Sequence, residues 1–125
     1  MSKIVIYEEN DLMRALLEEW LSEAGYGVHA AASHDQHSSH PADGRPADLV
    51  IVSLYMPKQG GVQLVREIQA MHPGAPLIAI SGQFLPGLSA GGAIAQALGV
   101  QQVIAKPLTR SDLLTAVRAI IGKPG

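Results

Sequence analysis

The sequence contains no cysteine, which excludes disulfide bonds, thiolate catalysis and cysteine-ligated zinc sites. No apolar run approaches the roughly 20 residues that a membrane-spanning helix needs. The first apolar run, Lys3 to Tyr7, is too short for a secretory signal and leads directly into acidic residues. We therefore expect a protein that is located in the cytoplasm and does not associate with membranes.

Charge of either sign is also scarce. Nine Lys and Arg residues face 11 Asp and Glu residues, a formal net charge of −2, which gives no basis for binding nucleic acid or an anionic membrane. With 47% hydrophobic and 16% charged residues, the 125-residue chain has the composition of a globular protein. We predict a single domain over residues 1–125 with a short tail at 122–125, so that any output has to pass through a partner.

Short apolar runs alternate with segments whose apolar residues recur at helical spacing. The runs predict strands over 4–7, 28–32, 48–54, 77–80 and 102–105; the helical segments predict helices over about 11–24, 62–71, 93–98 and 110–121. Asn10 is the expected N-cap of the first helix, and Thr109 with Asp112 resembles a capping box at the start of the last. Lys58 to Gly61 is expected to break the chain, and residues 33–46 to hold a short or frayed helix. This alternation predicts an α/β fold, a parallel sheet with helices on both faces.

Polar residues follow four of the predicted strands at the points where the strands end. They are Glu8 with Glu9, then Ser53, Ser81 and Lys106. The carboxyl ends of parallel strands meet at one edge of the sheet, which is where open α/β sheets bind ligands. The sequence therefore predicts a functional site at this edge.

The segment from Asp48 to Pro57 reads Asp-Leu-x-x-x-Ser-Leu-x-Met-Pro. It resembles the phosphoacceptor segment of response-regulator receiver domains, the CheY-like family, in which the position of Ser53 is the Asp that accepts the phosphoryl group. The resemblance extends over nearly the whole chain. It implies a flavodoxin-like three-layer sandwich with strand order 2-1-3-4-5, for which CheY is the example.

The resemblance also implies roles for the other residues. Glu8 and Glu9 match the acidic pair that binds Mg²⁺, and Tyr55 lies beside them just past the end of the third strand. Ser81 matches the Thr or Ser that contacts the phosphoryl group, and Lys106 matches the lysine of a Lys-Pro pair. Val103 occupies the position of the aromatic residue that rotates in the family's output switch.

Three of these positions depart from the family pattern. Ser53 offers a neutral hydroxyl in place of an ionised carboxylate, and a hydroxyl without an adjacent base is a weak nucleophile. Glu8 and Glu9 are each one methylene longer than Asp, and Mg²⁺ demands near-octahedral oxygen ligands. Val103 has no ring to bury and a stiff χ1. We expect no acyl phosphate and no cofactor beyond weak Mg²⁺ binding at Glu8 and Glu9.

The favoured interpretation is a degenerate receiver, or pseudo-receiver, in two-component signal transduction. It would be a phosphorylation-independent protein-interaction module and not an enzyme. Its expected partner is a signalling protein, either a histidine kinase or a downstream effector, and a homodimer could form through the 93–121 face.

Other interpretations stay open. The chain could accept phosphoryl from a histidine kinase at Ser53 or another non-Asp residue. A small hydrolase or phosphatase is disfavoured, since no Gly-x-Ser-x-Gly turn surrounds Ser53. Ser53 could simply close a strand, and Lys106 could only neutralise the two glutamates. The histidines at 34, 37 and 40 are spaced as zinc ligands could be, but a solvated loop is favoured there.

Overall fold

The computed structural model describes residues 3–31, 47–54, 58–81, 99–105 and 108–122. The elements in chain order are β1 (Lys3–Tyr7), α1 (Asp11–Glu23), β2 (Gly27–Ala31), β3 (Leu49–Leu54), α2 (Lys58–Met71), β4 (Leu77–Ser81), β5 (Gln102–Ala105) and α4 (Arg110–Ile121). The predicted helix over 93–98, the loop before it and the stretch 33–46 with its three histidines lie outside the described residues.

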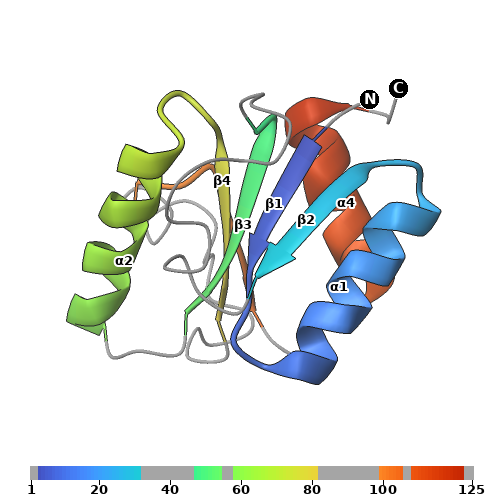
Figure 1. Ribbon diagram of the computed structural model, residues 1–125, viewed down its shortest axis with the longest axis horizontal. Helices are drawn as coiled ribbons and strands as arrows, with labels where there is room; N and C mark the ends of the chain where they lie inside the picture. Colours follow the sequence, from blue (N-terminus) through green and yellow to red (C-terminus); the bar gives the residue numbers. More distant parts are fainter. Residues whose placement is uncertain (1–2, 32–46, 55–57, 82–98, 106–107, 123–125) are drawn as a thin grey trace.

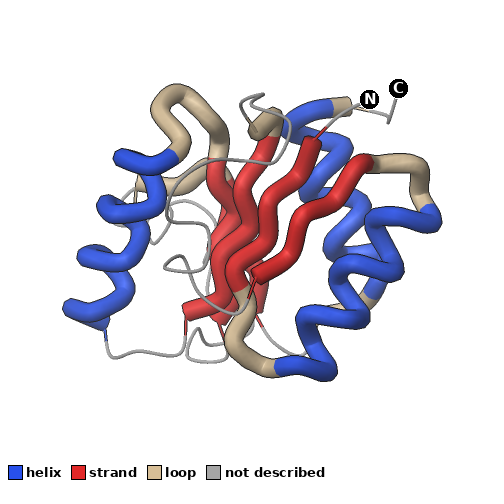
Figure 2. The backbone as a smooth tube through the Cα atoms, viewed as in Figure 1, coloured by secondary structure: helices blue, strands red, loops and turns tan. Residues whose placement is uncertain are grey.

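All five strands run parallel in one sheet, in the order β2-β1-β3-β4-β5. This confirms the predicted fold class and the strand order that the family resemblance implied. Figures 1 and 2 show three layers, with α1 and α4 on one face of the sheet and α2 on the other. Because helices cover both faces, the central strands β1 and β3 are buried along their whole length, as their unbroken apolar runs predict.

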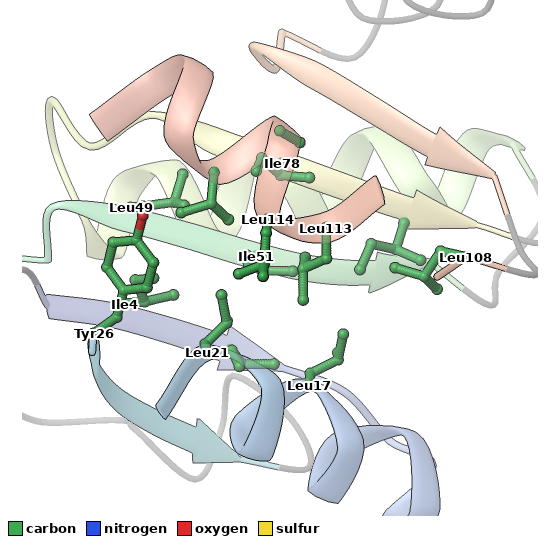
Figure 3. Close-up of a cluster of buried hydrophobic side chains, with 14 residues drawn as sticks. Ile4, Leu17, Leu21, Tyr26, Leu49, Ile51, Ile78, Leu108, Leu113 and Leu114 are labelled. Carbon is green, nitrogen blue, oxygen red and sulfur yellow. The ribbon is translucent and has the colours of Figure 1, made fainter. Parts of the chain in front are cut away.

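Each face of the sheet carries its own apolar core. Alternate strand residues such as Ile4, Ile51 and Ile78 pack with Leu17 of α1 and Leu113 of α4 in one cluster (Figure 3). The residues between them point the other way. There Val5, Val52 and Ala79 pack with Val65 and Ile68 of α2. The period-two alternation of the strands therefore decides which helix each side chain meets.

Local capping fixes where the two helices on the first face begin. The Asn10 side chain accepts a hydrogen bond from the backbone N–H of Met13 at 2.8 Å. Thr109 and Asp112 form the predicted capping box, with two reciprocal hydrogen bonds of 3.0 Å. Each cap satisfies backbone donors that the first turn of a helix leaves without a partner.

The expected break at Lys58 to Gly61 is wrong, because α2 begins at Lys58 and runs through both glycines. Each glycine costs a helix interior about 1 kcal/mol relative to alanine. The later turns offset that cost, because Val65 and Ile68 are fully buried against the sheet. Tertiary packing therefore overrides the local preference.

At the amino ends of the strands, hydrogen bonds between Lys3 and Asp48 join β1 to the start of β3. The Lys3 backbone N–H donates to Asp48 Oδ2 at 2.7 Å, and the Asp48 N–H donates to the Lys3 carbonyl at 2.8 Å. Asp48 was predicted to open the third strand and instead lies one residue before it. These two bonds hold β3 in register with β1, which decides what meets at the far ends of the two strands.

Candidate functional site

The register of β1 on β3 places Glu8 beside Ser53. Tyr7 is the partner of Val52 in the ladder. Glu8 directly follows Tyr7 at the end of β1, and Ser53 directly follows Val52 within β3. The Ser53 hydroxyl donates a hydrogen bond of 2.5 Å to Glu8 Oε1. Both residues are buried, with 0% of Glu8 and 5% of Ser53 exposed. A carboxylate and an alcohol are thus in contact at the sheet edge where the sequence predicted a site.

The remaining polar atoms of Glu8 are also engaged. Its second carboxylate oxygen accepts from the backbone N–H of Asn10 at 3.0 Å. Its own N–H donates to the carbonyl of Ala31, and its carbonyl accepts from Nη1 of Arg14, each at 3.0 Å. Arg14 is held in turn by Asp11, with 2.5 Å between the charged groups. These bonds fix the turn from β1 into α1 around a buried carboxylate, whose charge the donors offset.

The structure separates two residues that the sequence had grouped. Glu8 is buried, whereas Glu9 is exposed to solvent. Ser81 ends β4 and is the ladder partner of Leu54 and Ala105, so its backbone lies at the same edge as Ser53. Nothing further is described of its side chain.

Of the three other predicted positions, the structure describes one. Val103 lies in β5, half-buried, and packs against the apolar cluster under α2. Tyr55 and Lys106 lie outside the described residues. Of the predicted site residues, the described part of the chain therefore brings Glu8 and Ser53 into contact.

Magnesium prefers near-octahedral coordination by oxygen and usually keeps several waters. Glu8 and Ser53 would offer it one buried carboxylate, whose two oxygens already accept internal hydrogen bonds, and one neutral hydroxyl. Among the described residues, no group of three His, Cys, Asp or Glu side chains could hold a metal ion. The described residues therefore fit a magnesium site poorly, and no chemical step is assigned to a metal here.

A second, partly buried polar contact, which the sequence did not predict, involves the side chain at the end of β1 that faces α2. The Tyr7 hydroxyl and His72 Nε2 are 2.7 Å apart. Burial raises the pKa of the Tyr7 phenol from 10.0 to about 12, because the charged phenolate is disfavoured away from water. The only sequence signal was a tyrosine at the end of a short apolar run, which did not indicate its partner.

The parallel sheet in this order is the flavodoxin-like arrangement, and a buried acidic residue and a hydroxyl lie at the carboxyl ends of β1 and β3. The chain belongs to the response regulator receiver domain family, which matches residues 4–118. It is therefore a receiver domain of two-component signalling.

Similar proteins agree with that assignment. The chemotaxis protein CheY of Thermotoga maritima is 25% identical over 118 residues, which cover 94% of this chain and 96% of CheY. The transcriptional regulatory protein CpxR of Klebsiella pneumoniae is 26% identical over 121 residues, which cover 97% of this chain and 50% of CpxR. The chain thus spans about half the length of CpxR and nearly all of CheY.

Among solved structures, the receiver domain of the sensor histidine kinase PA1611 from Pseudomonas aeruginosa PAO1 superposes with a TM-score of 0.73. The two are 25% identical, and the match covers 98% of each chain; that structure holds a magnesium ion in its active-site cleft. In the described part of the present chain, no helix has the length and apolar character needed to span a bilayer.

Proposed function

We propose that this chain is a degenerate receiver that acts as a protein-interaction module without phosphorylation at position 53. The observation that carries the proposal is the buried hydrogen bond from Ser53 to Glu8. An acyl phosphate forms on a carboxylate oxygen, and Ser53 has none to offer. The residue in contact with it does carry a carboxylate, but Glu8 is fully buried and its oxygens are engaged.

The same pair supports weak or no magnesium binding. In this proposal, hydrogen bonds from the Ser53 hydroxyl and the Asn10 N–H contribute to stabilising the negative charge of Glu8, as a bound metal ion otherwise would. A divalent ion would have to displace both hydrogen bonds and enter a buried position, which costs free energy. The magnesium seen in the PA1611 receiver domain is therefore not expected here.

The partner that we propose is a signalling protein, either a histidine kinase or a downstream effector. Self-association through the face built from residues 93–121 is a further possibility within this proposal. On the described part of that face, α4 exposes six residues: Arg110, Ser111, Asp112, Thr115, Arg118 and Ala119. A surface of short and charged side chains suits a non-obligate contact better than a permanent one. The module itself is proposed to catalyse no reaction.

A second candidate function has one observation in its favour. A hydroxyl that donates to a carboxylate, which is itself oriented by a third group, is the arrangement of an activated nucleophile. Ser53 could then attack the phosphorus of a phosphodonor such as a phosphohistidine. The bond from the Ser53 oxygen to phosphorus forms as the bond from phosphorus to the donor's leaving group breaks, the leaving group departs with that electron pair, and the Ser53 proton passes to Glu8, which leaves a phosphoester. The burial of both residues argues against this, because only 5% of Ser53 and none of Glu8 is exposed to solvent.

Intact-mass measurement after incubation with a small phosphodonor and Mg²⁺ tests the proposal. We expect no added mass, while a receiver domain that keeps the acceptor Asp, treated in parallel, gains one phosphoryl group. A base-stable adduct that is lost in Ser53→Ala would establish the second candidate. A hydroxylamine-sensitive adduct would refute both, because it would reveal an acyl phosphate on a carboxylate.

A further inference from the structure

The hydrogen bond between Tyr7 and His72 joins the sheet to the end of α2. Tyr7 is the last residue of β1, and His72 directly follows the last residue of α2. The two side chains meet with 2.7 Å between Tyr7 Oη and His72 Nε2, and with their ring centroids 5.9 Å apart. Tyr7 is 3% exposed and His72 is half-buried, so this polar contact is partly shielded from solvent.

Its place in the fold connects it to the candidate site. Tyr7 immediately precedes Glu8, and its ladder partner Val52 immediately precedes Ser53. Because successive strand residues point to opposite faces, Tyr7 points toward α2 while Glu8 points away from it. A shift of the Tyr7 backbone would therefore displace the Glu8–Ser53 pair on the opposite face.

The direction of the hydrogen bond depends on the tautomer of His72, because a phenol can donate to an unprotonated imidazole nitrogen or accept from a protonated one. In one of these two arrangements, the Tyr7 hydroxyl donates to Nε2 of a neutral imidazole whose proton is on Nδ1. Imidazolium carries protons on both nitrogens, so a protonated His72 would have to reverse or break this bond.

Protonation would also place a positive charge beside apolar side chains. Tyr7 belongs to the same buried cluster as Val52, Val65 and Ile68. A positive charge on the half-buried His72 would therefore lie close to these apolar side chains.

Other titratable or charged groups lie on the elements packed around α2. Among the side chains that the structure describes on the same face of the sheet and on the helix itself, they are Lys3 of β1, His29 of β2, Asp48 before β3, and Arg66 and Glu67 of α2. Lys3 is buried and would oppose a second positive charge. The side chains of Asp48, Arg66 and Glu67 are exposed, where water and salt weaken their effect.

We propose that Tyr7 and His72 form a proton-sensitive latch, which holds the C-terminal half of α2 against the sheet while His72 is neutral and loosens when His72 is protonated. This regulation goes beyond the proposed function and does not depend on phosphorylation or on magnesium. It would let a fall in pH change the mobility of α2 and, through the strand ends, the environment of the Glu8–Ser53 pair.

Native-state hydrogen exchange of the amides from Val65 to Met71 tests the latch, with rates corrected for the intrinsic effect of pH. Between about pH 8 and about pH 5, the range in which histidine titrates, we expect protection in the wild type to fall on the order of five-fold, the size of effect that one net hydrogen bond gives. His72→Gln keeps an acceptor that cannot titrate, so its protection should be nearly the same at both pH values. Tyr7→Phe should be loosened at both.

The control is His29→Gln, which removes another half-buried histidine and should leave the wild-type response intact. A pH response in His72→Gln equal to that of the wild type would overturn the proposal, as would a wild type with no response. The nitrogen chemical shifts of His72 give a second readout, independent of stability. A proton found on Nε2 rather than Nδ1 near pH 8 would also refute the latch.

Discussion

Removing the Ser53 hydroxyl leaves one oxygen of a fully buried carboxylate without the 2.5 Å donor that it has in the native protein. Hydrogen bonds to charged groups contribute about 1.5–3 kcal/mol to stability, more than neutral ones. The methyl group of alanine fits the space that serine occupies, so little is lost in packing. Ser53→Ala should therefore lower the free energy of unfolding by about 1.5–3 kcal/mol, a large share of the 5–15 kcal/mol typical of a domain.

Urea unfolding followed by circular dichroism measures this change, and Ser111→Ala provides the matched control. Ser111 lies exposed in the first turn of α4, where its loss should stay within about 0.5 kcal/mol. Glu8→Gln and the double variant complete a cycle that isolates the interaction between the two side chains. We expect a coupling energy on the order of 1 kcal/mol or more, because residues in direct contact do not behave additively.

A Ser53→Ala protein as stable as the Ser111→Ala control would refute this reasoning. It would mean that Glu8 is adequately solvated or paired without Ser53, and that the hydroxyl is incidental. A coupling energy near zero with a large single-variant effect would also count against it, because the loss would then come from packing and not from the hydrogen bond.

Two further predictions follow from individual contacts. Asn10→Ala removes the side-chain oxygen that accepts from the Met13 N–H, and it should lower the free energy of unfolding in urea by about 1 kcal/mol. Asn10→Asp keeps an acceptor and should lower it far less. Equal losses in the two variants would exclude a capping role. The raised pKa of Tyr7 means that the folded protein holds a proton that the unfolded chain releases near pH 10, so stability is fully present below that pH and is lost as pH rises toward about 12. Absorbance titration of phenolate should show this late transition in the wild type and not in Tyr7→Phe, and the same late transition in both proteins would contradict the assignment.

Much of the fold could be predicted from the sequence because its signals are local. The buried strands correspond to short unbroken apolar runs in the sequence, and α1 corresponds to a segment whose apolar residues recur at helical spacing. The caps at Asn10 and Thr109 involve residues three positions apart, which a sequence displays directly. The strand order is not local, and it came from the resemblance to the receiver family.

The site was predicted in part. The sequence placed Glu8 and Ser53 at the ends of parallel strands, and the register of β1 on β3 makes them neighbours. It could not separate Glu8 from Glu9, because which of two adjacent residues is buried depends on the direction in which the strand end points. It also mistook Lys58 to Gly61 for a break, since the packing of Val65 and Ile68 on the sheet is not visible to local propensity.

The sequence by itself determined the alternation of strands and helices and the presence of an alcohol, Ser53, near the end of the third apolar run. Only the tertiary structure decided that this alcohol donates to Glu8 and that Tyr7 reaches His72, 65 positions further along the chain. The physical reason is that such contacts depend on register and on how each helix lies against the sheet. Those features are set by the packing of the whole domain and by no single segment of it.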